Sequence, residues 1–198
     1  MRGLLVFLAL VFAGTPAVAG DLLFEAVTSG DRTAVEHVLD SGANVDSRAA
    51  DQATPLMAAA LQGQTAIAEL LLNKGAGVMA RNSGGLTPLH AAAYSGSVPI
   101  AKLLLEKGAV LDDAANKGGV TPLMVAGEGN HVELAEFLLA RGADVNHGEI
   151  HGYKPIARAL WKGNKVIVRL YKGHGATCLS PEIRGSEDFY RQCVEITQ

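Results

Sequence analysis

The chain has 198 residues, of which 48% are hydrophobic, 19% are charged and 5% are aromatic. This length accommodates one or two modest domains. The composition excludes a disordered polyelectrolyte, and the 23 glycines follow no three-residue period, which excludes a collagen-like chain. The formal net charge of −3 argues against a nucleic-acid binder, because such proteins usually carry a basic surface.

The first 19 residues have the pattern of a secretory signal peptide. Arg2 precedes an apolar run over residues 3–13, and Ala17-Val18-Ala19 supplies a small-x-small cleavage site. A membrane anchor is the alternative, but residues 3–19 contain Pro16 and are short for a span, which needs about 20 residues. We therefore expect cleavage after Ala19 and export, to the periplasm first and to the extracellular medium second, with no membrane contact afterwards.

A repeat of about 33 residues organises the rest of the chain. Thr-Pro-Leu occurs at residues 54–56, 87–89 and 121–123, and Lys-Pro-Ile at 154–156 is a degenerate fourth copy. The prolines are separated by 33, 34 and 33 residues. A Gly-Ala pair recurs with the same period, its glycines at positions 42, 75, 108, 142 and 175. A fixed period of this length is the signature of a repeat architecture.

Each section of the repeat has a physical interpretation. Thr before Pro predicts a helix start, because Thr caps the first backbone amides and Pro suits the first turn. A residue that tolerates positive φ ends this first helix, namely Gly30, Gly63, Gly96, Asn130 or Gly163. A second helix with an apolar stripe follows, over residues 65–73 in the second repeat, and a polar turn such as 112–119 closes the unit.

The segment Gly85-x-Thr87-Pro88-Leu89-His90-x-Ala92-Ala93 resembles the motif of the ankyrin repeat, and the resemblance covers residues 21–177. It implies an all-α repeat solenoid of five stacked helix-turn-helix units with loop fingers and a C-terminal cap. After the signal peptide 1–19, we expect a repeat domain at 20–178, with units at about 21–48, 49–81, 82–115, 116–148 and 149–178, and a capping segment at 179–198. One extra residue between Gly108 and Thr121 predicts a longer finger there.

The resemblance also implies non-catalytic binding of another protein through a concave face, made of finger loops and inner helices. Carrying over the family's variable positions gives candidate partner-binding residues in the loops, Asp51, Ala53, Ser83, Leu86, Lys117, Val120, His151 and Tyr153, and in the inner helices, Leu61, Gln62, Tyr94, Ser95, Glu128, Trp161 and Lys162. Exposed aromatic and leucine side chains in this set favour a buried interface. Packing on a neighbouring loop is the alternative for Leu61, Leu86, Tyr94 and Trp161.

The fifth repeat is basic, whereas the earlier repeats are acidic. Residues 149–178 carry Lys154, Arg158, Lys162, Lys165, Arg169 and Lys172 against Glu149 alone. Arg158 and Lys162 are four residues apart and share a helix face. Together with Tyr153 and Trp161 they suggest a site for an acidic partner surface, and a solvated basic end is the alternative. We expect a monomer.

Two cysteines lie near the C-terminus, Cys178 and Cys193. An even number of cysteines in an exported protein suggests a disulfide, which would tie the capping segment to the last Gly-Ala corner. The sequence leaves open whether the two are bonded.

The rival functions have weaker support. His147 and His151 flank Glu149 and could ligate zinc, with His174 as a third ligand only if the fold brings it close; surface histidines on a turn are the alternative. A metal-dependent enzyme or metal-binding protein using this segment, and a secreted effector that binds host proteins, are the alternatives to a binding module. No catalytic motif is present and no cofactor is expected. Exported ankyrin proteins suggest stress protection or toxin neutralisation as the biological role.

Overall fold

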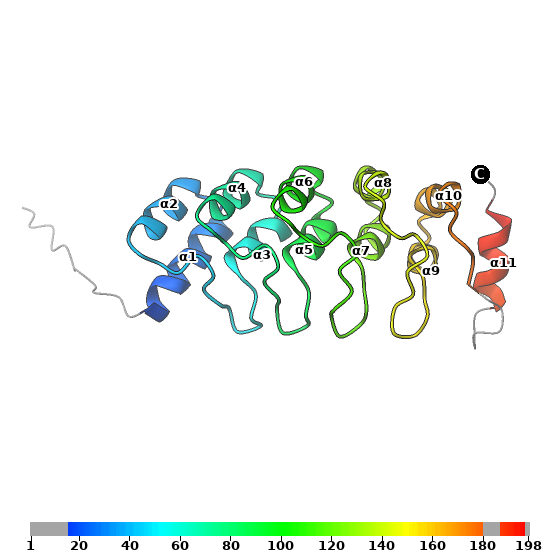
Figure 1. Ribbon diagram of the computed structural model, residues 1–198, viewed down its shortest axis with the longest axis horizontal. Helices are drawn as coiled ribbons and strands as arrows, with labels where there is room; N and C mark the ends of the chain where they lie inside the picture. Colours follow the sequence, from blue (N-terminus) through cyan, green and yellow to red (C-terminus); the bar gives the residue numbers. More distant parts are fainter. Residues whose placement is uncertain (1–15, 180–186, 197–198) are drawn as a thin grey trace, which may run out of the picture.

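The computed structural model describes residues 16–179 and 187–196, and every regular element in these residues is a helix. The elements are α1 (Pro16–Ser29), α2 (Arg32–Asp40), α3 (Pro55–Leu61), α4 (Thr65–Asn73), α5 (Pro88–Ser95), α6 (Val98–Glu106), α7 (Pro122–Glu128), α8 (Val132–Ala140), α9 (Pro155–Trp161), α10 (Lys165–Gly173) and α11 (Glu187–Glu195). Figure 1 shows an elongated stack of helix pairs, with the odd-numbered helices α1 to α9 in one row and the even-numbered helices in another. The predicted α-helical repeat solenoid is confirmed.

Only the last residues of the predicted signal peptide, 1–19, are among the residues that the structure describes. Helix α1 begins at Pro16 and includes the last residues of the predicted signal peptide. Residues 1–15 and the helix turn predicted at Ser180–Glu182 lie outside the described residues. No described helix is long and apolar enough to cross a membrane.

The inner helices start and end where the repeat motif places them. The hydroxyls of Thr54 and Thr121 accept hydrogen bonds from the backbone amides three residues on, and Pro occupies the first turn. Lys154 makes no such bond, which fits the degenerate fourth copy. The five residues expected to end these helices all have positive φ, including Asn130 at 58°.

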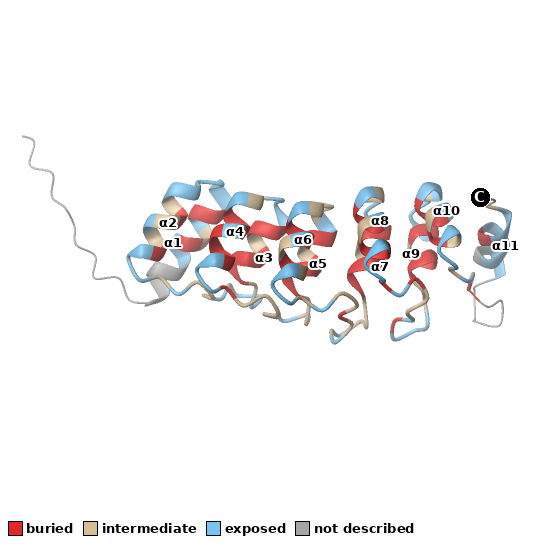
Figure 2. Ribbon diagram, turned by 45° about the horizontal axis from the view of Figure 1, so that its top comes forward, coloured by how far each residue is buried: buried red, intermediate tan, exposed pale blue. Residues whose placement is uncertain are grey.

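The core is continuous because equivalent side chains of successive repeats form columns. Leu71, Leu104 and Leu138 occupy one repeat position in the outer helices and are all 0% exposed. On the inner helices, Ala59, Ala92, Ala126 and Ala159 are likewise 0% exposed and let neighbouring helices approach closely. Figure 2 shows this buried stripe running from α1 through α10. Each repeat therefore covers the apolar face of the next.

Tyr171 replaces leucine in the outer-helix column of the fifth repeat. Its buried hydroxyl donates a hydrogen bond to the carbonyl of Leu123 on α7, at 2.7 Å. Gly127 makes the room, because a Cβ there would lie 2.5 Å from the Tyr171 hydroxyl oxygen. Burial also raises the pKa of Tyr171. These two residues together fix the fifth repeat on the fourth.

The fingers are joined to one another by backbone hydrogen bonds. The amides of Ser83, Lys117 and Ile150 each donate to a carbonyl of the preceding finger, at 2.8, 3.1 and 3.2 Å. The finger between α6 and α7 contains the extra residue predicted from the sequence. Asn116 accepts from the amides two and four residues on, as Asn82 does one repeat earlier, so the extra residue lies between Gly108 and Asn116. The fingers thus form a bonded row below the inner helices (Figure 1).

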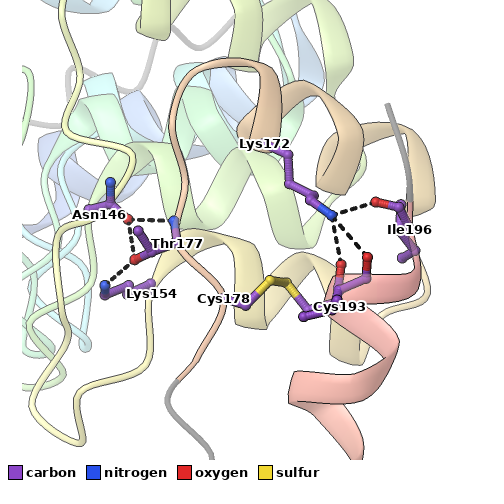
Figure 3. The surroundings of a disulfide bond; sticks show 8 residues. Asn146, Lys154, Lys172, Thr177, Cys178, Cys193 and Ile196 are labelled. Atoms are coloured by element: carbon purple, nitrogen blue, oxygen red, sulfur yellow. Dashed lines mark hydrogen bonds between the residues drawn. A yellow bond between two sulfur atoms is a disulfide. The ribbon is translucent and has the colours of Figure 1, made fainter.

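The C-terminal helix α11 covers the end of the stack beside α9 and α10. The sulfur atoms of Cys178 and Cys193 lie at bonding distance, 2.05 Å, as the sequence suggested. Lys172 of α10 donates from Nζ to the carbonyls of Cys193 and Ile196, at 3.0 and 2.6 Å, and thereby caps α11 (Figure 3). Cys193 is only 2% exposed. A covalent bond and a side-chain cap therefore hold the end helix in place.

We predict that Leu104→Ala lowers the free energy of unfolding by about 2–5 kcal/mol, because Leu104 is fully buried between two repeats. Chemical denaturation monitored by circular dichroism measures this change. Val166→Ala on the outer face of α10, where the side chain is 52% exposed, is the matched control and should change stability by less than about 0.5 kcal/mol. Equal effects of the two substitutions would contradict the shared core.

Removing the disulfide should loosen the end of the stack. The two cysteines are 15 residues apart, and the chain-entropy account gives such a bond about 3 kcal/mol. Cys178→Ser with Cys193→Ser should therefore lower the unfolding free energy by up to about this amount. Backbone amide exchange in α11 should become faster while exchange in α3 stays the same. Two alkylatable thiols in the oxidised, native protein would contradict the bond.

Candidate functional site

A groove of about 710 Å³ lies between the fingers and the inner helices α3, α5 and α7. It is lined by Asp51, Ala53, Met57, Ala58, Leu61, Asn82, Leu86, Thr87, His90, Ala91, Tyr94, Val125, Glu128, Gly129, His131 and Lys162. Apolar side chains from three successive repeats make up much of this lining. The groove therefore runs along the stack on the face that carries the fingers.

The groove has the period of the repeat. Its floor contains Ala58, Ala91 and Val125, and each occupies the same position in its repeat. The small floor residues leave space above the helices. On the rim, Leu61 is 49% exposed and Tyr94 is 67% exposed. These two exposed apolar side chains beside the groove make it the candidate interaction surface.

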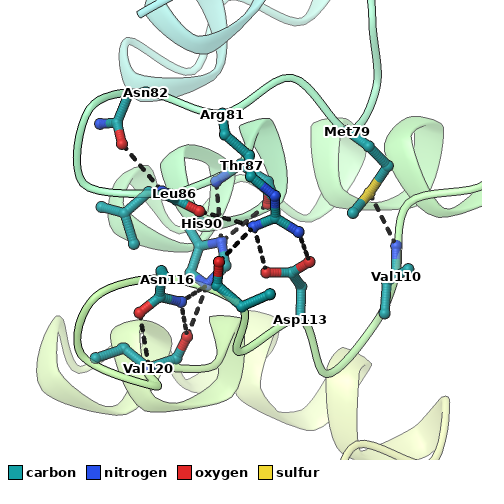
Figure 4. Close-up of polar contacts among 12 residues, drawn as sticks. Met79, Arg81, Asn82, Leu86, Thr87, His90, Val110, Asp113, Asn116 and Val120 are labelled. Carbon is teal, nitrogen blue, oxygen red and sulfur yellow. Dashed lines mark hydrogen bonds and ion pairs between the residues drawn. The ribbon is translucent and has the colours of Figure 1, made fainter. Parts of the chain in front are cut away.

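His90 connects the floor of the groove to the next finger (Figure 4). Its Nδ1 accepts from the backbone amide of Thr87 at 3.2 Å, so Nε2 carries the proton and donates to the carbonyl of Val120 at 2.8 Å. The ring is 2% exposed, and burial lowers the pKa of His90. Met57 and Met124 occupy this position in the neighbouring repeats and offer no such bonds, as the sequence indicated.

An arginine and an aspartate fix the finger wall. Arg81 forms a two-point ion pair with Asp113 of the next finger, at 3.0 and 2.5 Å, and also donates to the carbonyl of Gly85 at 2.8 Å (Figure 4). This contact lowers the pKa of Asp113 below its usual value. In the preceding repeat Arg48 has the equivalent role, because it donates to the carbonyls of Gln52 and Arg81. These contacts within the protein therefore hold the fingers in position along the groove.

His131 lines the groove beyond the end of α7, away from the fingers. Its Nε2 lies 2.8 Å from the carbonyl oxygen of Tyr94, at the end of α5. The ring is accommodated because Gly96 and Gly129 carry no side chain, and a Cβ at either would come within 2.5 Å of it. Sequence analysis missed this residue, since the arrangement depends on two glycines and a carbonyl from two different repeats.

The basic residues of the fifth repeat are partly neutralised within the protein. Arg158 pairs with Glu128 at 3.1 Å and with Glu149 at 3.7 Å, and Lys162 lies 3.3 Å from the other oxygen of Glu128. The side chain of Arg158 is 21% exposed and that of Lys162 is 55% exposed. Of this predicted pair, Lys162 is the cation that faces solvent.

The structure brings together seven of the predicted partner-binding residues in the groove: Asp51, Ala53, Leu61, Leu86, Tyr94, Glu128 and Lys162. Tyr153 and Trp161 form a second cluster on the fifth repeat, with ring centroids 4.5 Å apart in an edge-to-face contact, and His151 lies 6.5 Å from Tyr153. Outside both groups are Gln62, Ser83, Ser95, Lys117 and Val120.

Ser95 has a structural contact, because its hydroxyl donates to the carbonyl of Ala60 on the preceding repeat at 2.7 Å. The residues that sequence analysis did not select include Met57, Ala58 and Ala91 on the floor. The repeat pattern could have identified the two alanines, because Ala58 and Ala91 each lie three residues before the exposed side chain of their inner helix, Leu61 or Tyr94.

The candidate zinc segment is arranged as a turn. The Glu149 side chain accepts from the amide of His151 at 3.1 Å and pairs with Arg158, so its carboxylate is already engaged. Over the described residues, no group of three or more histidine, cysteine or acidic side chains is placed to hold a metal ion.

An all-helical stack with a preformed, partly apolar groove on one face belongs to the class of solenoid binding scaffolds. Two family models describing ankyrin repeats match the chain, one of three copies over residues 23–116 and one of many copies over 104–159. The chain belongs to the ankyrin repeat family, whose repeats are protein–protein interaction modules. A comparison with curated proteins finds no match.

The buried His90 predicts a specific dependence of stability on pH. Because burial lowers the His90 pKa in the folded state, protonation favours unfolding, and stability should fall as pH drops below about 6.5. The contribution is at most about 1.4 kcal/mol per pH unit. His90→Met, the residue of the neighbouring repeats, removes it. Wild type and variant should differ in the slope of unfolding free energy against pH below about pH 6.5, and identical slopes would contradict a buried neutral imidazole.

Proposed function

We propose that this protein is a non-catalytic binding module that holds a partner protein in the groove over α3, α5 and α7. The observation that supports this most directly is the exposure of Leu61 and Tyr94 beside an apolar floor. Large apolar side chains exposed in this way contribute favourable free energy when a partner covers them.

The fixed walls support the same proposal. Arg81, Asp113 and His90 hold the fingers through contacts that need no ligand. A partner that binds a preformed surface loses less free energy in ordering that surface. The proposed site is thus organised before the partner arrives.

We further propose that the protein acts outside the cytoplasm, as a monomer, after cleavage at Ala19. The signal-peptide pattern of residues 1–19 and the Cys178–Cys193 bond support this together, because disulfides persist in oxidising compartments. The periplasm is the favoured location and the extracellular medium the second. Stress protection or neutralisation of a toxin is the proposed biological role, through capture of a protein.

Affinity capture with matched variants tests the binding proposal. The mature protein, immobilised by its C-terminus, is exposed to the exported fraction of its own cells, and bound proteins are identified by mass spectrometry. Leu61→Ser with Tyr94→Ala should lower the recovery of the specific partner at least tenfold, because two central apolar contacts are lost. Val166→Ser, also exposed and apolar but on the outer face, should leave recovery unchanged.

Thermal unfolding of each variant confirms that the surfaces compared are folded. Recovery of every partner to the same extent by wild type and by the groove variant would contradict the proposal.

A further inference from the structure

We propose that the partner enters the groove as an extended segment in the polyproline II conformation, lying along the stack with an apolar side chain at every third residue. A basic residue of the segment lies at the Asp51 end and an acidic residue at the Lys162 end. This inference rests on the proposed function and specifies the form of the bound ligand.

The period of the groove sets the spacing of the ligand. Equivalent floor positions, Ala58, Ala91 and Val125, come from neighbouring inner helices. Packed helices lie about 8–10 Å apart, so the ligand meets an equivalent apolar position at about this interval. A polyproline II chain is extended, has three residues per turn and rises about 3.1 Å per residue, so every third side chain lies on the same face at intervals of about 9 Å.

A helical ligand could match the same interval with one residue in seven, at about 1.5 Å per residue, but its backbone carbonyls are bonded within the helix. A polyproline II segment has no internal hydrogen bonds, so its carbonyls are available to donors that line the groove. Three repeats span about 20 Å, which six or seven residues of such a segment cover.

An extended ligand also needs partners for its backbone. The Oδ1 atom of Asn82 accepts from the amides of Gly84 and Leu86, each at 3.0 Å (Figure 4 shows the second). Its Nδ2 has no partner within the region of the chain that the structure describes. This amide lines the groove and is free to donate to a carbonyl of the ligand.

The two ends of the groove differ in charge. Asp51 is exposed, and within the described residues it makes no ion pair; one of its oxygens accepts the amide of Ala53 at 3.0 Å. At the other end, Glu128 is shared between Arg158 and Lys162, and Lys162 remains 55% exposed. Opposite charges at the ends select a segment whose charges run the opposite way, and they also fix its direction.

The probe is a blocked nine-residue peptide with leucine at its second, fifth and eighth positions, threonine between them, lysine first and glutamate last. A peptide of the same composition with adjacent leucines is one control, and a sixteen-residue helical peptide with leucines seven apart is another. Fluorescence anisotropy with the mature, disulfide-bonded protein measures affinity. We expect the spaced peptide to bind at least tenfold more tightly than both controls.

Protein variants connect the binding to the groove. Tyr94→Ala should weaken the spaced peptide about tenfold or more, whereas Glu136→Ala on the outer helix α8 should not. Asp51→Lys should weaken this peptide and strengthen a version with lysine and glutamate exchanged, a rescue that a merely unfolded variant cannot give.

The outcomes separate this inference from the proposed function. Preference for the helical peptide, equal binding of the adjacent-leucine peptide, or no peptide binding would overturn the extended segment. If the exported partner is still lost from the Leu61/Tyr94 variant in those cases, groove binding stands and only the ligand form is wrong. Partner capture that is unaffected by the groove variant overturns both.

Discussion

The structure depends on one constraint: a helix pair of this size cannot bury its own apolar faces. Each inner helix has only seven or eight residues from the second repeat onward, and isolated helices so short are marginal in water. The buried column of the outer helices, Leu71, Leu104, Leu138 and Tyr171, and the alanine contacts of the inner helices cross the boundaries between the second and fifth repeats. The ends of the stack then need covers, which α1 and α2 supply on one side and the tethered α11 on the other.

Stacking also produces the groove that we propose as the binding surface. Because helices and fingers repeat in register, small floor residues align above one another and leave a groove along the stack. Polar contacts then fix its walls from finger to finger, through Arg81 with Asp113 and through His90 with Val120. These polar groups support the groove, whereas Leu61 and Tyr94 are exposed beside it and are the side chains that we propose contact the partner. Stability and recognition are thus divided between different side chains of the same repeat.

The sequence was sufficient for the fold because its signals are local. Thr54 and Thr121 cap helices within three residues, and Asn130 ends one as Gly63 and Gly96 end others. The site was predicted less completely. The pairing of Arg158 with Glu128 and the place of His131 join residues 30 and 37 apart, and a single sequence gives no direct signal for such distances. Tyr171 with Gly127 is a further example, since neither residue alone indicates the other.

The central claim is that neighbouring repeats hold the fingers in place and so form the groove before any partner binds. Amide hydrogen exchange of the free, oxidised protein tests it most directly. The amides of Ser83, Lys117 and Ile150, which donate across adjacent fingers, should exchange far more slowly than in an unstructured peptide. Exchange at the unstructured rate at all three positions would show that the fingers are not joined, and the account of a preformed groove would be wrong.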